Sequence, residues 1–200
     1  MKQHRPLVIV LHGPSGAGKD SVIDLLRERT GIHRATSSTS RAPRDDERDG
    51  NHYHFLSEDD FRDKVERGDF AEWALVYGDY KGLERTELDE PLSRGEDVII
   101  RTDVQGAKTW REKLEGAIFI FLLADDDEAL QDRLKKLGSE SQASFNRRVA
   151  ELGTELADIE NNDYVVRNRK NRLDQAVEEL ERIIERERQN PKRPAARLLS

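Results

Sequence analysis

Cysteine is absent from this chain of 200 residues, and methionine occurs once. The lack of thiols excludes disulfides, zinc–thiolate sites and thiol catalysis, and it fits a cytoplasmic protein. Long apolar segments are also missing. The longest run, residues 117–124 (AIFIFLLA), is much shorter than the roughly 18 residues that a membrane helix needs. The basic start, MKQHR, precedes a short apolar run without a small-residue cleavage site, so we predict neither a signal peptide nor a membrane partner.

Positively charged residues are fewer than negatively charged ones. The chain has 34 Lys and Arg residues and 41 Asp and Glu residues, so the net charge is −7. A nucleic-acid-binding domain is more often basic, so we do not expect a nucleic acid partner. A local arginine cluster can still bind a small anion against the sign of the whole chain. The length allows one domain with small mobile subdomains, and nothing in the sequence indicates an oligomeric state.

Short apolar runs alternate with helical patterns along the chain. Strands are expected at residues 7–11, 70–76, 98–100, 118–123 and 164–166, and helices at 59–67, 105–114, 128–136, 146–159 and 173–188. This alternation predicts an α/β fold with a mostly parallel sheet. The last segment, residues 190–200, contains two prolines and has no periodicity, so we expect it to be disordered.

A glycine-rich turn follows the first expected strand and precedes a helical pattern. It reads Gly13, Pro14, Ser15, Gly16, Ala17, Gly18, Lys19 and matches the first seven positions of the phosphate-loop pattern G-x-x-x-x-G-K-[ST]. The glycines let consecutive backbone N–H groups converge on phosphate oxygens, and the helix that follows points its positive dipole end at the same place. Because Lys19 adds a full charge, the loop alone predicts a nucleotide-binding site, and its residues are candidates for binding ATP.

The eighth position of the pattern departs from it, because Asp20 stands where Ser or Thr is usual. That hydroxyl normally ligates Mg²⁺, and a carboxylate is also a hard oxygen ligand, so Asp20 is a candidate ligand of Mg²⁺ bound with ATP. Alternatively, Ser21 supplies the hydroxyl after a small shift. A third interpretation makes Asp20 only a favourable residue at the helix N-terminus.

A second constellation follows the phosphate loop in order. It consists of SSTSRAPR at residues 37–44, Glu47, Gly50, Tyr53–Phe55 (YHF), Glu72-Trp73 and Asp103–Gly106 (DVQG). With this constellation the chain resembles the guanylate kinase family, from the phosphate loop to at least Val166. One such motif would be weak evidence, whereas five in register are specific.

The resemblance implies roles for individual residues. The GMP phosphate would be held by Arg41, Arg44 and Tyr53, and guanine would be read by Ser37, Glu72 and Asp103. A carboxylate accepts hydrogen bonds from both N1–H and N2–H₂ of guanine, whereas adenine would present a lone pair to it. In the lid, Arg133 and Arg148 would join Lys19 and Arg41 in neutralising the transferring phosphoryl group, and Asn168 would contact ATP.

Taken one at a time, these residues also have purely structural interpretations. Arg41 and Arg44 could form a solvated basic patch, and Tyr53 could pack in the core. Asp103 could cap the helix expected to start near Gln105. Arg148 could pair with an acidic residue of its own helix. Together, and beside a phosphate loop, the functional interpretation is favoured.

The resemblance also implies a three-layer fold of the P-loop NTPase type. Its core would comprise residues 1–34, 87–128 and 158–189. A GMP-binding subdomain would span residues 35–86, and a lid residues 129–157. The tail, residues 190–200, would lie outside these parts.

Four departures from the family pattern bear on the site: Asp20, Lys81, Leu83 and Arg101. Lys81 replaces a phosphate-binding tyrosine and would contact the GMP phosphate as a charge. Leu83 replaces a hydroxyl residue, which removes one hydrogen bond to guanine, worth about 1 kcal/mol. Asp20 gains a negative charge and Arg101 stands where an acidic residue is common, so we hypothesise that the two changes compensate around Mg²⁺. Asp20→Thr alone should then impair Mg²⁺-dependent turnover. In the lid, Leu137 replaces a usual arginine, and Lys135 and Lys136 are the candidates to substitute for it.

These observations predict an ATP:GMP phosphotransferase that acts through positioning and electrostatics. Two alternatives stay open. The GKDS sequence at residues 18–21 also suits a kinase of the ribose 1,5-bisphosphate type, and guanylate-kinase-like domains can be non-catalytic binding modules that have typically lost the phosphate loop.

Overall fold

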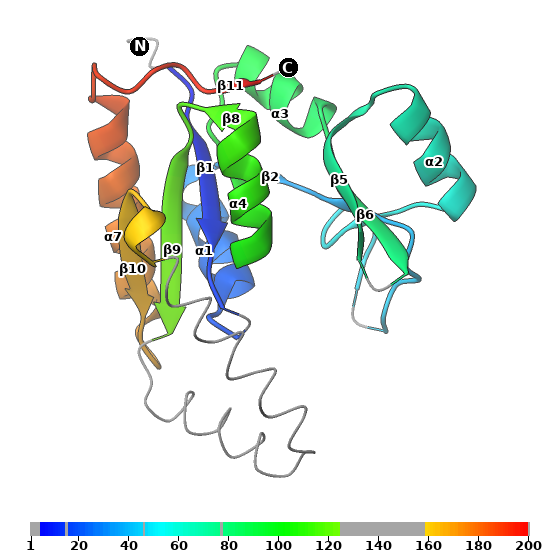
Figure 1. Ribbon diagram of the computed structural model, residues 1–200. Helices are drawn as coiled ribbons and strands as arrows, with labels where there is room; N and C mark the ends of the chain where they lie inside the picture. The colour runs from blue at the N-terminus through cyan, green and yellow to red at the C-terminus, as the bar shows by residue number, and fades with distance from the viewer. Residues whose placement is uncertain (1–4, 15, 46, 77, 125–158, 200) are drawn as a thin grey trace.

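The computed structural model describes residues 5–14, 16–45, 47–76, 78–124 and 159–199. Its centre is a five-stranded sheet in which every neighbouring pair is parallel (Figure 1). The strand order is β10 (Tyr164–Asn168), β9 (Ile118–Ala124), β1 (Val8–His12), β7 (Val98–Arg101) and β2 (His33–Ala35). The central strand β1 is buried along its whole length, as expected for an apolar run covered on both faces. The parallel α/β fold predicted from the sequence is confirmed.

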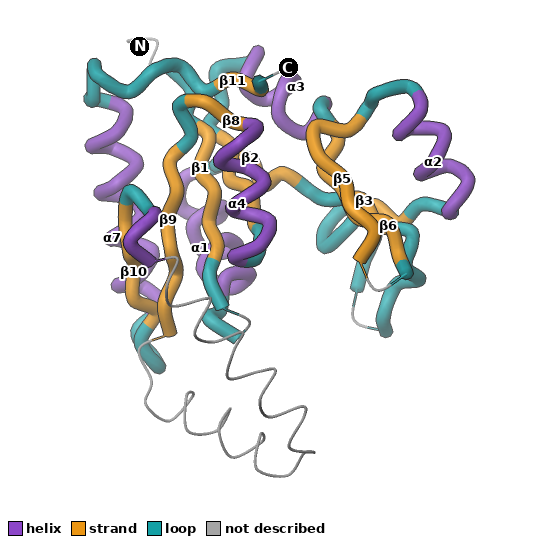
Figure 2. The backbone as a smooth tube through the Cα atoms, in the orientation of Figure 1, coloured by secondary structure: helices purple, strands orange, loops and turns teal. Residues whose placement is uncertain are grey.

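Helices cover both faces of this sheet, which gives three layers (Figure 2). On one face, α1 (Lys19–Thr30) packs against α7 (Leu173–Arg188), and Ile9 and Leu11 of β1 join their apolar core. On the other face, Val8 and Val10 pack with Trp110 of α4 (Val104–Lys113). Alternate residues of one strand thus feed two cores, as the period of a strand requires. None of the helices in the described ranges is long and apolar enough to span a membrane.

A second, smaller sheet lies apart from the first and carries α2 (Glu58–Glu66), on the right of Figure 1. Its order is β4 (His54–Phe55), β3 (Ser38–Thr39), β6 (Asp79–Glu84) and β5 (Phe70–Val76). Phe61 of α2 stacks on Phe70 with ring centroids 4.3 Å apart and anchors the helix on the sheet. The chain then enters α3 (Thr86–Ser93). All four strands lie within residues 35–86, the range predicted as the GMP-binding subdomain.

The C-terminal segment differs from its prediction. Residues 190–199 were expected to be disordered, but β11 (Arg197–Leu198) pairs antiparallel with β8 (Leu114–Glu115). Arg193 donates hydrogen bonds to Glu187 at 2.5 Å, to the carbonyl oxygen of Ala117 at 3.0 Å and to Asp163 at 3.1 Å. A tail without periodicity is therefore ordered by the partly buried guanidinium of Arg193 and by a short backbone pairing, and neither has a local sequence signal.

Arg193→Met should destabilise the protein by about 3 kcal/mol, because it leaves the buried carboxylate of Glu187 without its cation. Burial alone would raise the pKa of Glu187, but hydrogen bonds from Arg193, Tyr164 and Asn190 lower it to about 2. The stability from this carboxylate is present above the ordinary carboxyl pKa and is lost as pH falls toward about 2. Thermal unfolding should show a Tm lower by roughly 6–12 °C near neutral pH and a smaller difference in acid.

The same tail supplies the control. Arg197 pairs with Glu115, but its side chain is 69% exposed, and Arg197→Gln should leave Tm within about 2 °C of the wild type. Equal losses for both variants would show that Arg193 has no special role.

The other helices and strands can be compared with those predicted from the sequence. Every strand expected in the described ranges is present, although β2, β3, β4, β6, β8, β11 and α3 were not predicted. The predicted helix at residues 128–136, and nearly all of that at 146–159, lie outside the described residues. A short 3-10 helix, η1 (Ile159–Asn161), precedes β10.

Candidate active site

The phosphate loop connects β1 to α1 at the carboxyl edge of the parallel sheet, where open α/β sheets bind their ligands. Gly13 has φ 141°, and a side chain there would place its Cβ 2.3 Å from the carbonyl oxygen of Leu122. Lys19 folds back over the loop and donates from Nζ to the carbonyl oxygens of Gly13 at 2.7 Å and Pro14 at 2.9 Å. The lysine charge is thus held at the loop where a phosphate would bind. Ser15 lies outside the described residues.

Asn168, predicted to contact ATP, lies at the end of β10 and holds the loop from the side. Its Nδ2 donates to the carbonyl oxygen of Ala17 at 2.9 Å. Gly18 caps α1 with φ 80°, and a Cβ on it would lie 2.4 Å from that same Nδ2. Gly16 and Ser21 are exposed on the loop and the first turn of α1. The structure therefore brings Asn168 and the loop together, although no sequence spacing links them.

Gly18→Ala should weaken ATP binding about tenfold, because it strains a left-handed residue and pushes Asn168 off the loop. Gly31→Ala is a matched control: Gly31 caps the other end of α1 with φ 73°, and nothing lies within 4 Å of its Cβ position. Both variants should lose stability in thermal unfolding from the strained backbone, and Gly18→Ala should lose somewhat more because it also disturbs the hydrogen bond of Asn168. In a titration with ATP, only Gly18→Ala should lose affinity, and equal affinities would refute the role of the contact.

Asp20 lies between two arginines. Its Oδ1 accepts a hydrogen bond from Arg34 at 2.7 Å, and its Oδ2 accepts one from Arg101 at 2.9 Å. Arg34 comes from β2, is 7% exposed, and also donates to Asp24 at 3.1 Å. The two departures from the family pattern, Asp20 and Arg101, are therefore in direct contact, as compensating changes would be.

This arrangement does not suit Asp20 as an inner ligand of Mg²⁺. A divalent cation on the carboxylate would lie close to two guanidinium groups, and at about 4 Å each repulsion would amount to several kcal/mol even at an effective dielectric constant of about 20. Both carboxylate oxygens are also already engaged. Of the three interpretations left open for Asp20, this geometry therefore disfavours direct ligation of Mg²⁺. Sequence spacing gave no sign that Arg34 would reach it.

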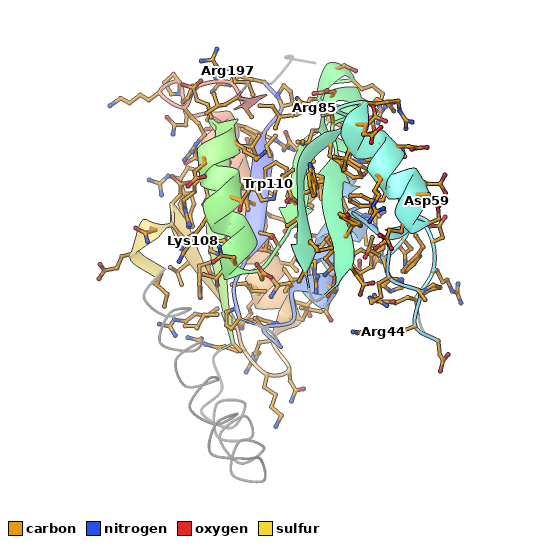
Figure 3. All side chains as sticks on the ribbon, turned by 45° about the vertical axis from the view of Figure 1, so that its right-hand side comes forward. Arg44, Asp59, Arg85, Lys108, Trp110 and Arg197 are labelled. Carbon is orange, nitrogen blue, oxygen red and sulfur yellow. The ribbon has the colours of Figure 1, made fainter. Side chains whose placement is uncertain are left out.

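The predicted GMP-phosphate residues gather around one tyrosine ring. The guanidinium carbon of Arg41 lies 5.8 Å from the ring centroid of Tyr53, and Nζ of Lys81 lies 5.2 Å from it. Two cations therefore converge on one side chain, and one of them is Lys81, which was predicted to contact the GMP phosphate as a charge. Arg44 lies on the exposed loop before β4, at the margin of the molecule (Figure 3).

Glu47 organises this cluster. It accepts hydrogen bonds from Arg41 at 2.8 and 2.9 Å and from the backbone N–H of Arg44 at 2.9 Å. The backbone hydrogen bond from Arg44 and the charge of Arg41 together lower the pKa of Glu47. The carboxylate therefore orients Arg41 beside the Tyr53 ring. The sequence contained Glu47 within the family motif but gave no sign of this role.

Two of the predicted guanine readers, Glu72 on β5 and Asp103 before α4, are close enough for their charges to interact. Burial, together with the charge of Asp103, raises the pKa of Glu72 to about 7, while Lys113 and Lys81 lower it. Asp103 caps α4 by accepting from the N–H of Gly106 at 2.7 Å, so its structural interpretation holds, and its charge still reaches Glu72.

Ser37 and Leu83 also occupy positions that the family resemblance links to guanine binding. Ser37 lies between β2 and β3, where its carbonyl oxygen accepts from the N–H of His54 at 2.9 Å. Leu83 is 1% exposed and packs in the apolar core that also contains Val8, Val10 and Trp110. An apolar side chain thus packs where the family pattern has a hydroxyl. The residues predicted to belong to a lid lie outside the described residues: Arg133, Lys135, Lys136, Leu137 and Arg148.

Comparisons with known proteins agree with this geometry. A family model described as guanylate kinase matches residues 3–187. The chain belongs to the guanylate kinase family. It is 43% identical over 186 residues to "Guanylate kinase 2, chloroplastic/mitochondrial" of Oryza sativa subsp. japonica, covering 92% of this chain and 65% of that protein. It is 40% identical over 177 residues to the guanylate kinase of Xanthomonas axonopodis pv. citri, covering 88% of this chain and 86% of that one.

A solved structure supports the same assignment. The guanylate kinase of Anaplasma phagocytophilum superposes with a TM-score of 0.73 and 25% identity, covering 95% of this chain and 90% of that one. The family resemblance inferred from the motifs is therefore confirmed, together with the α/β fold class. The chain spans about two thirds of the length of its rice relative and most of the length of the two bacterial ones.

Proposed function

We propose that this protein transfers the γ-phosphoryl group of ATP to GMP and releases ADP and GDP. Membership of the guanylate kinase family supports a nucleoside monophosphate kinase, with ATP and GMP as the family's substrates. The observation that carries the choice of GMP is Glu72, a partly buried carboxyl of the smaller sheet whose charge interacts with that of Asp103 before α4. Such a group rejects a base that cannot donate two hydrogen bonds to it.

The proposed mechanism relies on positioning and charge. Gly13 to Lys19, together with Asn168, hold the ATP phosphates, and Lys19 neutralises charge on the transferring group. Arg41, Tyr53 and Lys81 hold the GMP phosphate, with Glu47 fixing the direction of Arg41 and Arg44 adding charge from the loop. Ser37 assists Glu72 and Asp103 at guanine. Arg133 and Arg148 are proposed from the family pattern as the lid cations.

Mg²⁺ is proposed as the ion that accompanies ATP, as in kinases generally. This ion commonly keeps most of its ligands from phosphates and water. We place Asp20 outside its inner shell, because both carboxylate oxygens are bonded to arginines. Residues 35–86 and 129–157 are proposed to close on the substrates and exclude water.

The test is ADP formation from ATP and Mg²⁺ with GMP, AMP, UMP, CMP and ribose 1,5-bisphosphate offered separately. Turnover with GMP alone supports the proposal. Turnover with ribose 1,5-bisphosphate would move the assignment to that type of kinase. ATP binding without turnover on any acceptor would favour a non-catalytic module, although the intact loop with Lys19 argues against one.

We retain the cytoplasm as the expected location, and we note that the rice relative is named for the chloroplast and mitochondrion. The absence of a nucleic acid partner also stays a prediction. Fractionation of the native host, followed by detection with an antibody, would test the location.

A further inference from the structure

The group formed by Asp20, Arg34 and Arg101 lies at the carboxyl edge of the parallel sheet. Arg101 ends β7 and pairs in register with Leu11 of β1, two residues before the phosphate loop begins. The next backbone N–H, that of Thr102, donates to the carbonyl oxygen of Leu11 at 3.1 Å. Arg101 is thus anchored on the strand beside the one that leads into the loop.

The two arginines differ in what they can still do. Arg34 is 7% exposed and shared between Asp20 and Asp24, so it serves as a buried support. The side chain of Arg101 is 35% exposed and uses one amino group on Asp20. Its Nε is enclosed and has no hydrogen-bond partner among the described residues. A guanidinium carries five N–H donors, so Arg101 keeps donors for a further oxyanion.

We propose that Arg101 binds the phosphates of ATP and that Asp20 is a positioning residue that holds it there. At this edge of the sheet the oxyanion within reach of the loop is a nucleotide phosphate. Arg101 then neutralises part of the negative charge of the phosphates. In the usual family pattern a hydroxyl and an acidic residue would instead help to hold a metal ion for this purpose. The proposal rests on ATP binding at the loop, and it assigns Asp20 a role toward Arg101 rather than toward Mg²⁺.

The sign of one substitution separates the two roles. If Asp20 positions Arg101, Asp20→Asn should weaken the binding of metal-free ATP, because Arg101 loses its anchor. If Asp20 is a metal ligand, Asp20→Asn should leave metal-free ATP binding unchanged or make it tighter, because a negative charge beside the phosphates disappears. Its damage would then appear only with Mg²⁺ present.

The experiment is calorimetric titration of the full chain with ATP in EDTA and again with excess Mg²⁺. In EDTA we expect Arg101→Gln to weaken binding about tenfold or more, since a charge-assisted hydrogen bond is lost. Asp20→Asn should weaken it about fivefold, and the double variant should be no worse than Arg101→Gln, because the two residues act as one unit. Arg101→Lys should recover part of the loss.

Controls separate this inference from the proposed function. Arg94, an exposed arginine paired with Glu96 after α3, gives Arg94→Gln as the neutral variant. Lys19→Met reports whether the loop binds ATP. If Lys19→Met loses affinity while Arg101→Gln and Asp20→Asn do not, this inference is wrong and the kinase assignment stands. If the wild type binds no ATP, the proposed function itself fails. Thermal unfolding of each variant verifies that it is folded.

Discussion

Lys19→Met is expected to lower kcat about 10²- to 10³-fold with little change in stability. Nζ of Lys19 lies over the phosphate loop, 2.7 Å from the carbonyl oxygen of Gly13 and 2.9 Å from that of Pro14. Removing a preorganised charge from the site of phosphoryl transfer costs transition-state stabilisation of about 3–4 kcal/mol. Met keeps the length of the side chain, so the buried stem still packs. Steady-state ADP formation at saturating ATP and GMP measures the loss.

Lys108→Met provides the comparison, because Lys108 is exposed on α4 (Figure 3). That variant should keep wild-type kcat. This result would show that the loss of one lysine charge elsewhere on the protein does not lower kcat. If Lys19→Met retained more than about a tenth of wild-type kcat, the loop would not hold the transferring phosphate as proposed. A simultaneous large fall in Tm would instead point to a structural role for Lys19.

The phosphate loop and the core of the fold were predictable because their signals are local. Glycines at fixed spacing, a lysine and a preceding apolar run lie within one short segment, and the backbone conformation of Gly13 and Gly18 follows from that segment. The buried strands β1, β7 and β9 were also readable, since parallel strands covered on both faces are apolar throughout. Short strands such as β3, with two residues, carry too little pattern for this.

The contacts of Asp20 could not be predicted in the same way. Arg34 reaches it because β2 lies beside β7 in the sheet, an adjacency that depends on strand order rather than on spacing along the chain. The sequence did show that Asp20 and Arg101 depart from the family together. It could not show that they touch, nor that a third residue completes the group.

The order of the tail was mispredicted for a related reason. Residues 190–199 do contain prolines and lack periodicity. They are nevertheless ordered, because Arg193 binds the carboxylates of Asp163, just before β10, and Glu187 of α7. Such long-range polar contacts satisfy buried groups without any repeating pattern. Composition alone therefore overestimated disorder.

Glu72→Gln is expected to lower kcat/KM for GMP about 10²- to 10³-fold, the second large effect. A carboxylate accepts from both N1–H and N2–H₂ of guanine, whereas the amide of Gln presents one acceptor and one donor and leaves a buried mismatch worth about 3–4 kcal/mol. Turnover at limiting GMP and saturating ATP measures the loss. Glu66→Gln, on the exposed face of α2, should leave kcat/KM unchanged. A Glu72→Gln variant that kept wild-type kcat/KM would remove Glu72 from guanine recognition.

The same residue should make GMP binding depend on pH. Burial raises the pKa of Glu72 to about 7, so below that pH the carboxyl is protonated and accepts only one of the two hydrogen bonds. The affinity of the wild type for GMP should therefore fall by up to about tenfold per pH unit below about pH 7. Because the phosphate of GMP titrates in the same range, the ratio of wild-type to Glu72→Gln affinity isolates the side chain. A ratio that stays constant with pH would contradict this assignment.

The raised pKa also implies that Glu72 opposes folding in its working, ionised form. Its stabilising contribution is fully present below the ordinary carboxyl pKa and is lost as pH rises through about 7. Above that pH the ionised carboxylate costs the folded state up to roughly 3 kcal/mol, so Glu72→Gln should raise Tm by several degrees at about pH 8 and by little at about pH 5. Thermal unfolding at the two pH values, without GMP, measures this directly. Suppose that Glu72→Gln loses guanine recognition and gains stability only at about pH 8. The burial of the Glu72 carboxylate, which recognition needs, would then be what destabilises the free enzyme. Equal Tm changes at both pH values would show that packing, rather than ionisation, sets the effect.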